Sequence, residues 1–248
     1  MTAMKSKSRL DTLVVERGLV SSRERARALI MAGRVLVNGI KVEKPGTEVG
    51  HDAVLSLTGP DIPYVSRGGI KLRAALEAFE INPAGMRILD AGASTGGFTH
   101  CLLDRGAARV IAVDVGYGQL DWKLRNDPRV TVLERTNIRY LEPESLPQPI
   151  DAAVADLSFI SLRLVLPRLS EFLPRGGWAV VLVKPQFEVG RGQVGKGGVV
   201  RDPEKIRGAV EGIRVFAGEC GFLVLGEIES PITGPKGNRE FLLHLQKQ

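Results

Sequence analysis

Ile88-Leu89-Asp90-Ala91-Gly92-Ala93-Ser94-Thr95-Gly96-Gly97-Phe98 is the stretch of this 248-residue chain that decides the fold. A short apolar run that ends in glycines is typical of a β-strand passing through a tight turn into a helix. Glycines allow a ligand to approach the backbone, and the amides that open a helix can bind an anionic group. The spacing is not G-x-G-x-x-G, so the dinucleotide fingerprint is not met. A turn that serves packing alone is the alternative interpretation.

An acidic residue, Asp114, ends the next apolar run, 24 residues after Asp90. In doubly wound sheets, a carboxylate near this position accepts hydrogen bonds from ribose hydroxyls. An Asp that caps the following turn is the alternative. Because the acid occurs together with the glycine-rich turn, the pattern favours a nucleoside-containing cofactor.

Further apolar runs alternate with helical patterns along the chain. The predicted strands are Arg87–Asp90, Val110–Asp114, Val130–Leu133, Ala152–Asp156 and Trp178–Lys184. Five strands separated by helices predict an α/β fold with a parallel, doubly wound sheet, whose ligand crevice lies beyond the carboxyl ends of the strands.

The last two strand-like runs, Phe222–Glu229 and Glu240–Leu245, are joined by a loop rich in proline and glycine. This loop is too short for a crossover helix. We therefore expect the two strands to pair antiparallel at one edge of the sheet.

The N-terminal part of the chain has a different pattern. Ser22 is a plausible N-cap for a helix that runs to about Met31, and Gly33 ends this helix. Within Val35–Val42, the Asn38-Gly39 pair is a strong signal for a tight hairpin. These features predict a compact module with two short helices and a hairpin.

Domain boundaries follow from the distribution of proline and glycine. Residues 59–63, Gly-Pro-Asp-Ile-Pro, favour neither helix nor strand. We expect one domain over residues 1–58, a linker over residues 59–63 and a second domain over residues 64–248.

The positive charge of the chain is concentrated at its N-terminus. Residues 1–47 carry ten Lys and Arg against four Asp and Glu, whereas the remaining residues carry 24 of each sign. This asymmetry favours a polyanionic partner for the N-terminal module. A basic face that is merely solvated is the alternative.

The N-terminal module resembles the S4 RNA-binding domain over nearly its whole length. The motifs that carry the resemblance are Arg9-Leu10-Asp11, Ser22-Arg23, Ala32-Gly33-Arg34-Val35 and Val37-Asn38-Gly39. The resemblance implies contacts between basic side chains and RNA. We expect these contacts from Arg9, Arg23, Arg27, Arg34 and Lys41, and from Arg67 in the second domain. Base stacking is not expected of the module, since no aromatic residue precedes Tyr64.

Composition argues against membrane and metal functions. The longest apolar run, Trp178–Val183, is far shorter than the ~18 residues needed to span a bilayer, and the N-terminus has no apolar signal core. Two distant cysteines and three scattered histidines form neither a disulfide framework nor a zinc cluster. We expect a cytoplasmic protein without a bound metal.

The glycine-rich turn, Asp114 and the closing antiparallel pair together resemble the Rossmann-like methyltransferase fold, which binds S-adenosylmethionine. Asn137 follows the third strand, where such folds contact the adenine. The resemblance implies cofactor contacts from Asp90, Gly92, Ala93, Ser94, Gly96, Gly97, Phe98, Asp114, Asn137 and Asp156.

Four further motifs extend the resemblance to the whole chain. They are Ser66-Arg67-Gly68-Gly69-Ile70-Lys71-Leu72, Asp156-Leu157-Ser158-Phe159-Ile160-Ser161-Leu162, Val183-Lys184-Pro185-Gln186-Phe187-Glu188 and Gly237-Asn238-Arg239-Glu240. As a set they resemble the TlyA family, ribosomal RNA cytidine 2′-O-methyltransferases related to the FtsJ type. The resemblance implies that ribosomal RNA or a ribosomal subunit is the partner.

The Lys-Asp-Lys-Glu tetrad of that family corresponds to Lys71, Asp156, Lys184 and Glu240. A ribose 2′-hydroxyl is a very weak acid, whereas a sulfonium methyl group is already activated. The protein must therefore place the hydroxyl in line and accept its proton, which a neutral lysine can do. Our hypothesis makes Lys184 the base, Lys71 its tuning partner and the substrate holder, and the two acids orienting groups. These roles could be exchanged within the tetrad.

Two other functions compete with this interpretation. One is a non-catalytic RNA-binding assembly factor that keeps the cofactor fold, and the intact tetrad argues against it. The other is a membrane-lytic protein, because members of the family are often labelled haemolysins. The chain has no basic amphipathic helix with aromatic anchors, which argues against membrane lysis.

The segment Phe187–Arg201 contains several glycines among basic residues. It could close over RNA, or it could be a plain connection. The patterns determine neither the modified nucleotide, nor the ribosomal subunit, nor the oligomeric state.

Overall fold

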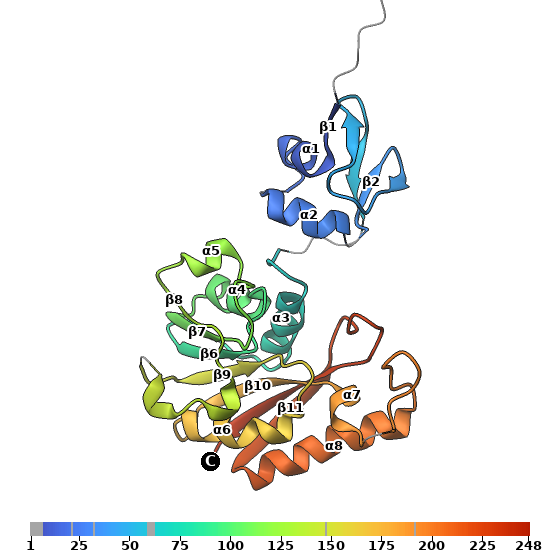
Figure 1. Ribbon diagram of the computed structural model, residues 1–248. Helices are drawn as coiled ribbons and strands as arrows, with labels where there is room; N and C mark the ends of the chain where they lie inside the picture. Colours follow the sequence, from blue (N-terminus) through green and yellow to red (C-terminus); the bar gives the residue numbers. More distant parts are fainter. Residues whose placement is uncertain (1–6, 21, 32, 59–62, 147, 191) are drawn as a thin grey trace, which may run out of the picture. The chain divides into compact units, whose positions relative to one another are not determined.

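In the computed structural model, the described residues are 7–20, 22–31, 33–58, 63–146, 148–190 and 192–248 (Figure 1). The chain divides into two compact units, Met1–Asp61 and Ile62–Gln248. Most of the linker predicted at residues 59–63 lies outside the described residues, and only Pro63 is described.

The first unit combines two helices with short antiparallel strands. Its elements are β1 (Lys7–Arg9), α1 (Leu10–Glu16), α2 (Arg23–Met31), β2 (Val35–Val37), β3 (Ile40–Lys41), β4 (Glu48–Gly50) and β5 (Leu55–Leu57). Strand β1 pairs with β4, and β2 pairs with both β3 and β5.

The local signals that predicted this unit are confirmed. The Ser22 hydroxyl accepts a hydrogen bond from the Arg25 N–H at 3.2 Å, as expected of an N-cap. Asn38 and Gly39 have φ values of 51° and 80° and connect β2 to β3 in the predicted hairpin. A small core unites the elements and includes Leu10, Leu13, Val14, Ala26, Ile30 and Val35.

The second unit is built on a seven-stranded sheet with the order β11-β12-β10-β9-β6-β7-β8. The strands are β6 (Arg87–Ala91), β7 (Arg109–Val113), β8 (Val130–Leu133), β9 (Ala152–Ala155), β10 (Trp178–Val183), β11 (Phe222–Glu229) and β12 (Phe241–Lys247). Strand β12 runs antiparallel to its neighbours β10 and β11, and the other paired strands are parallel. The predicted sheet and its antiparallel closing pair are therefore confirmed.

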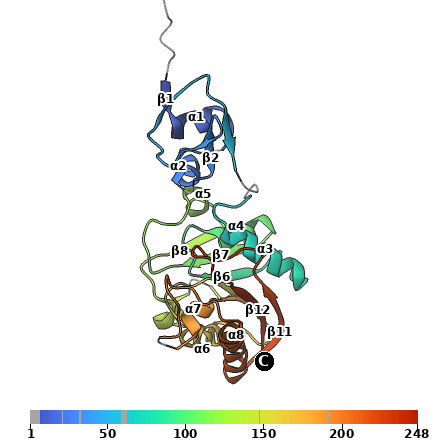
Figure 2. The ribbon, with the colours of Figure 1, turned by 90° about the vertical axis from the view of Figure 1, so that its right-hand side faces the viewer.

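Helices cover both faces of this sheet. They are α3 (Gly68–Ala78), α4 (Gly97–Asp104), α5 (Trp122–Arg125), α6 (Leu166–Phe172), α7 (Pro185–Glu188) and α8 (Pro203–Glu219), with short 3₁₀ turns η1 (Ile138–Tyr140), η2 (Pro143–Ser145) and η3 (Leu162–Leu164). Helices α3 and α4 lie on one face, and α6 and α8 lie on the other (Figures 1 and 2).

Alternation along the strands explains the two layers. In β10, Val181 and Val183 pack into the core shared with α6 and α8, whereas Val180 and Leu182 pack into the core shared with α3 and α4. A strand whose side chains are buried on both faces has a continuous apolar sequence, as Trp178–Val183 does. Helix α8 adds a matching apolar stripe of Ile206, Val210, Ile213 and Ala217.

The strand order places a crevice at the carboxyl ends of the central strands. From β6 the chain first forms β7 and β8, which lie on one side of β6 within the sheet. It then returns to form β9, which pairs with the other side of β6. Ligands bind at such a topological switch point in open α/β sheets.

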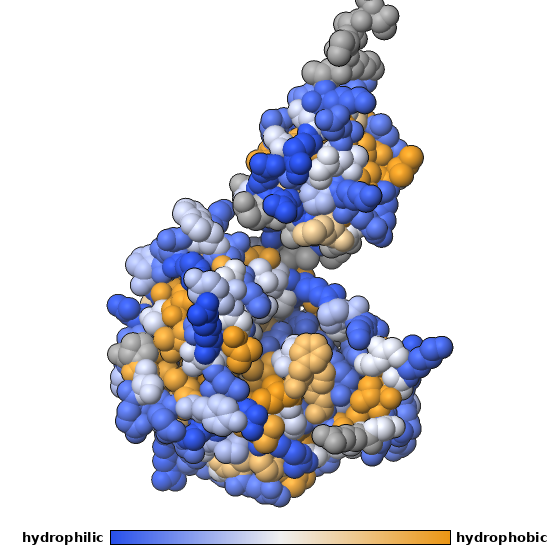
Figure 3. All heavy atoms as spheres, viewed as in Figure 1, coloured by the Kyte–Doolittle hydropathy of each residue, from blue (hydrophilic) through white to orange (hydrophobic). Residues whose placement is uncertain are grey.

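Three further observations concern membranes, metals and the surface. No helix among the described residues is long and apolar enough to cross a bilayer. Over the same residues, no group of three or more His, Cys, Asp and Glu side chains could hold a metal ion. Hydrophobic residues nevertheless reach the surface of the second unit among hydrophilic ones (Figure 3).

Candidate active site

The structure brings the four predicted tetrad residues together. Lys71 lies in α3, Asp156 and Lys184 directly follow β9 and β10, and Glu240 directly precedes β12. Lys71 Nζ donates a hydrogen bond to Glu240 Oε2 at 2.5 Å and lies 3.9 Å from Asp156 Oδ2. Lys184 Nζ lies 2.6 Å from Asp156 Oδ1 and donates to Ser158 Oγ at 3.1 Å.

These contacts form an ion-pair chain in the order Glu240, Lys71, Asp156, Lys184. Lys71, Lys184 and Glu240 are buried, and the Asp156 side chain is 21% exposed. Asp156 Oδ1 has no hydrogen-bond partner of normal geometry among the described residues, so its contact with Lys184 is ionic. Buried charges are costly unless they are paired, and each lysine here has at least one carboxylate neighbour.

The sheet topology explains why residues so distant in sequence meet. Strands β9 and β10 are parallel neighbours, with Val181 opposite Ala155, so their carboxyl ends lie together. Strand β12 runs the other way, and its first residue, Phe241, lies opposite Val183 at the end of β10. The reversed strand thereby delivers Glu240 to the edge of the sheet where the parallel strands end.

A pocket of about 610 Å³ lies beside Asp156. Five of the predicted cofactor-binding residues line it: Gly92, Ser94, Asp114, Asn137 and Asp156. The other predicted cofactor residues, Asp90, Ala93, Gly96, Gly97 and Phe98, are not among the lining residues. These five are buried in or beside the turn between β6 and α4.

Gly92 allows the turn after β6 to approach the tetrad. Its φ is +85°, and an added Cβ would lie 2.7 Å from the backbone oxygen of Asp156. Only glycine combines this backbone conformation with so close a contact. The wall of the pocket at this point therefore consists of backbone.

Asp114 connects the two loops that flank the pocket. Its Oδ2 accepts a hydrogen bond from the Ser94 N–H at 2.8 Å, and its Oδ1 accepts one from the Gly116 N–H at 2.7 Å. The turn-capping interpretation thus describes part of its role. Each carboxylate oxygen can accept a further hydrogen bond, so Asp114 can also bind a ribose hydroxyl in the pocket.

Asp90 lies inside β6 and supports the glycine-rich turn from behind. Its side chain is fully buried, and its Oδ2 accepts a hydrogen bond from Thr99 Oγ1 at 2.6 Å. Burial, opposed by the Thr99 hydrogen bond and assisted by the charge of Asp156, raises the pKa of Asp90 to about 7. Its Oδ1 has no hydrogen-bond partner among the described residues.

Phe159 is a pocket residue to which sequence reasoning assigned no role. It lines the pocket, its side chain is 91% exposed, and its φ of 63° is in the left-handed region. The ring lies 5.4 Å from that of Phe187, which follows Lys184 in α7. A bulky residue with positive φ is rare. The available signal was a phenylalanine between polar residues at the end of a buried strand.

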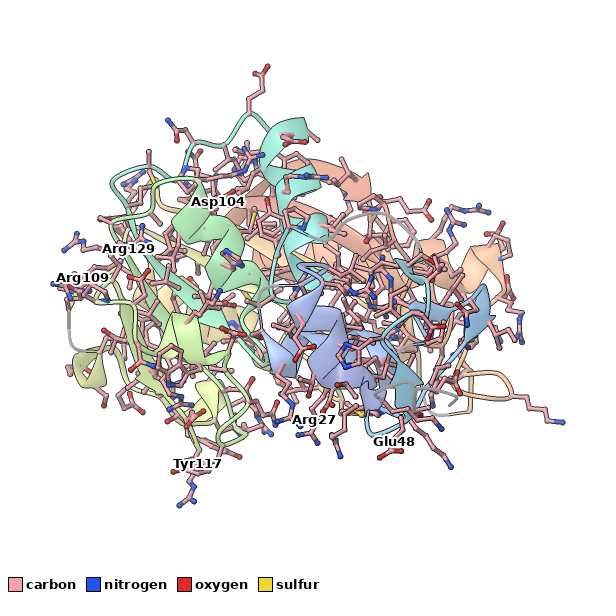
Figure 4. The ribbon with its side chains drawn as sticks, turned by 90° about the horizontal axis from the view of Figure 1, so that it is seen from above. Arg27, Glu48, Asp104, Arg109, Tyr117 and Arg129 are labelled. Carbon is pink, nitrogen blue, oxygen red and sulfur yellow. The ribbon has the colours of Figure 1, made fainter. Side chains whose placement is uncertain are left out.

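Another exposed aromatic residue, Tyr117, lies in the sequence between the pocket-lining residues Val115 and Gln119. The Tyr117 side chain is 69% exposed and extends outward from the loop after β7 (Figure 4). The Arg135 guanidinium lies 4.4 Å from the centroid of its ring. Such a pair offers a face on which a nucleobase can stack.

In the first unit, two residues that are predicted to bind RNA contact the same acidic side chain, Asp11. Arg9 and Arg23 both donate hydrogen bonds to Asp11, whose side chain is fully buried, while each arginine is about half exposed. The hydrogen bonds from Arg9, and then those from Arg23, lower the pKa of Asp11 against the opposing effect of burial. The two guanidinium groups are thus held at one place on the surface.

The other residues that are predicted to bind RNA make different contacts. Arg27 is exposed on α2 (Figure 4). Arg34 Nε donates to the backbone oxygen of Thr58 at 2.8 Å, and Lys41 Nζ lies 2.6 Å from Glu43 Oε1. Arg67 is exposed at the start of α3 in the second unit.

Comparison with known proteins agrees with this geometry. The model of the FtsJ-like methyltransferase family matches residues 64–247, and that of the S4 domain matches residues 8–55. The chain is 54% identical over 246 residues to the 16S/23S rRNA (cytidine-2′-O)-methyltransferase TlyA of Mycobacterium tuberculosis, covering 99% of this chain and 92% of the relative.

Other relatives carry a different name. The chain is 42% identical to Hemolysin A of Brachyspira hyodysenteriae, covering 95% of this chain and 98% of that protein. A solved structure of a candidate hemolysin from Streptococcus thermophilus has a TM-score of 0.78 and 46% identity, covering 98% and 90% of the two chains. Since both domain models match and the identity to a TlyA protein extends over the whole chain, this protein belongs to the TlyA family of FtsJ-like methyltransferases with an S4 domain.

Proposed function

We propose that this protein transfers a methyl group from S-adenosylmethionine to the ribose 2′-hydroxyl of a cytidine in ribosomal RNA. The observation that carries the proposal is the convergence of Lys71, Asp156, Lys184 and Glu240 beside the pocket after β6. The 54% identity to a protein named for this reaction supports the choice of substrate. Action on ribosomal RNA implies a cytoplasmic location.

The pocket fits the proposed cofactor. Asp114 offers carboxylate oxygens for ribose hydroxyls, and Val113, Ile138 and Leu157 offer apolar surface for a purine ring. The backbone wall at Gly92 permits close approach. Asp156 lies both at the pocket and in the tetrad, so it connects the cofactor to the catalytic groups. When bound, S-adenosylmethionine supplies an activated methyl group.

The protein's own residues then have to orient the ribose oxygen and take its proton. We assign proton acceptance to Lys184 Nζ, with Asp156 and Ser158 fixing the position of the amine. Lys71 Nζ has two carboxylate neighbours, Glu240 and Asp156, whereas Lys184 Nζ has one. In this scheme Lys71 holds the substrate oxygen by a hydrogen bond.

We propose that the target base stacks on the ring of Phe159. The Phe159 ring is almost fully exposed at the pocket, although the left-handed backbone conformation of this residue is strained. An exposed aromatic ring at an active site can stack on a base that has left its helix. Stacking at Phe159 would place the ribose of the same nucleotide near the tetrad.

The S4 unit is proposed to supply RNA affinity. It carries the surplus of positive charge of the chain, and the paired Arg9 and Arg23 present two guanidinium groups together. Phosphate contacts from arginine position an RNA without reading its sequence. We therefore assign target choice to the second unit and binding strength largely to the first.

The test is ribose methylation of ribosomal RNA. Purified small and large ribosomal subunits would be incubated with S-adenosylmethionine and the protein. The RNA of each ribosomal subunit would then be digested and analysed by mass spectrometry. We expect a cytidine that gains one ribose methyl group, in one subunit or in both. A complete absence of new methylation in both subunits, with the cofactor bound, would favour the non-catalytic assembly factor instead.

A further inference from the structure

Asn238 is a buried polar residue in the loop between β11 and β12, and it is only 3% exposed. Its Oδ1 accepts a hydrogen bond from the Val200 N–H at 3.0 Å, and its Nδ2 donates to the Gly198 oxygen at 2.9 Å. Both ends of the amide are thus bound to a different loop, almost forty residues earlier in the chain. Removing the amide would leave two backbone groups without their partners.

Within the loop between β11 and β12, Asn238 belongs to a turn that packs over Glu240. The Asn238 backbone oxygen accepts a hydrogen bond from the Gly234 N–H at 2.8 Å. An added Cβ on Gly234 would lie 2.7 Å from Glu240 Oε1, so this turn lies directly against the carboxylate whose other oxygen binds Lys71. The turn therefore packs directly against the carboxylate of Glu240.

The partner loop leads back to the other end of the tetrad. Gly198 and Val200 close the glycine-rich segment that starts after α7, which itself begins next to Lys184. Glycine-rich segments have high conformational entropy and need specific contacts to be ordered. The amide of Asn238 supplies two such contacts at the far end of the segment.

We propose that Asn238 is a positioning residue for methyl transfer: its side-chain amide joins the glycine-rich segment to the turn over Glu240 and holds both in the arrangement that the reaction needs. The inference rests on the proposed function and adds a residue outside the tetrad to it. Asn238 itself contacts no tetrad side chain, so its effect passes through the Gly234 turn and through the segment. Misplacement of this kind slows the chemical step more than it weakens binding.

The adjacent residue offers a matched control. Arg239 makes two side-chain hydrogen bonds, at 2.7 and 2.6 Å, to Glu229, and both side chains are about half exposed. Asn238→Ala and Arg239→Ala therefore each remove two side-chain hydrogen bonds from the same loop. One change affects a buried link, and the other affects an exposed pair.

The first measurement is single-turnover methyl transfer with saturating RNA and cofactor. For Asn238→Ala we expect the rate to fall by about tenfold or more, while the affinity for S-adenosylmethionine changes by less than about twofold. Arg239→Ala should keep the rate within about twofold of the original. Equal rates for the two variants, or a loss of cofactor affinity matching the loss of rate, would overturn the proposal.

Asn238→Asp separates the hydrogen-bond donor from the acceptor. The carboxylate can still accept from Val200, but its second oxygen would face the Gly198 oxygen without a hydrogen. Protonation restores a donor, so the rate of this variant relative to the original protein should rise as the pH falls. A ratio that stays constant with pH would contradict the assigned roles of the two amide atoms.

A second readout does not depend on catalysis. Trypsin can cut after Lys196, inside the glycine-rich segment, when the segment opens. We expect Asn238→Ala to speed this cleavage by about tenfold and Arg239→Ala to leave it unchanged, as followed by mass spectrometry of the fragments. If Asn238→Ala is cleaved faster but the original protein methylates no RNA, the proposed function is refuted and the link between Asn238 and the glycine-rich segment is supported. Unchanged cleavage would refute the link.

Discussion

At the residue scale, the tetrad is a chain of alternating acidic and basic side chains, three of which are buried. Each buried charge is tolerable only because its neighbour is present. Loss of one member therefore alters the position and charge state of the next, and replacements in the tetrad will not have additive effects. The end members are the easiest to interpret, since each has one ionic partner.

Lys184 is such an end member. Lys184→Ala should lower the single-turnover rate by about 10³-fold, because general base catalysis contributes on this order. Cofactor affinity should stay within about threefold, because Lys184 does not line the pocket. Lys205→Ala, an exposed lysine in α8, is the control and should behave like the original protein. Methylation that persists without Lys184 would move the role of base to another residue.

Asp90 makes a prediction about pH and stability. Burial raises its pKa to about 7, so the folded protein holds a proton that the unfolded chain releases near pH 4. The resulting stabilisation is fully present below pH 4 and is lost as the pH rises to about 7. Between about pH 5 and pH 8, the free energy of unfolding should fall by roughly 3 kcal/mol relative to Asp90→Asn, which lacks this titration.

Urea unfolding of both proteins across this pH range measures the effect. Other titrating groups are common to the two proteins and cancel in the difference. The free energy of unfolding of the original protein minus that of Asp90→Asn should decrease as the pH rises. A flat difference curve would mean that Asp90 is ionised in the folded protein.

At the element scale, the strands were predictable because local patterns determine them. Runs such as Trp178–Val183 are apolar throughout because both faces of the sheet are covered, and the Asn38-Gly39 turn carries its own conformational preference. The tetrad could be predicted only through resemblance, since its members come from four separate elements. The motif Gly237-Asn238-Arg239-Glu240 indicated Glu240, but the link from Asn238 to Gly198 and Val200 could not be predicted, because it depends on two loops meeting in space.

For some predicted site residues, the sequence indicated the residue but not its contacts. Asp90 is predicted to contact the cofactor, and the structure adds its place inside β6 and its hydrogen bond with Thr99. Arg9 and Arg23 are predicted to bind RNA, and the structure adds their shared contact with the buried Asp11. In both cases, the residue type indicated a charged function and only the fold supplied the partner.

The turn between β6 and α4 carries an element-scale prediction. Gly92→Ala combines a φ of +85° with a contact of 2.7 Å to the Asp156 oxygen, so the turn must shift. We expect a loss of about tenfold or more in affinity for S-adenosylmethionine, measured by calorimetry. Gly85→Ala is the matched control, with a φ of +76° but nothing within 4 Å of the added Cβ.

The comparison separates strain from contact. Each alanine pays about 1 kcal/mol or more for its left-handed conformation, so both variants should lose similar stability for that reason. Only Gly92→Ala should lose cofactor binding, since only its Cβ collides with the pocket wall. Equal cofactor affinities in the two variants would place the cofactor elsewhere.

At the scale of the whole molecule, charge and chemistry reside in different units. The first 47 residues hold the entire surplus of positive charge, and the unit Ile62–Gln248 holds the tetrad and the pocket. The pocket is lined entirely by residues of the second unit. Affinity for a polyanion and affinity for the cofactor should therefore respond to different changes.

Removal of residues 1–58 tests this division of roles. The shortened protein should bind S-adenosylmethionine within about twofold of the full chain, because no pocket residue is lost. Its affinity for ribosomal RNA, measured by fluorescence anisotropy, should fall by about tenfold or more and should depend less steeply on salt between about 50 and 200 mM. Salt dependence reports the number of phosphate contacts, so a shallower slope would locate the lost contacts in the S4 unit. Unchanged RNA affinity with an unchanged slope would instead assign RNA binding to exposed basic and aromatic side chains of the second unit, among them Arg135 and Tyr117.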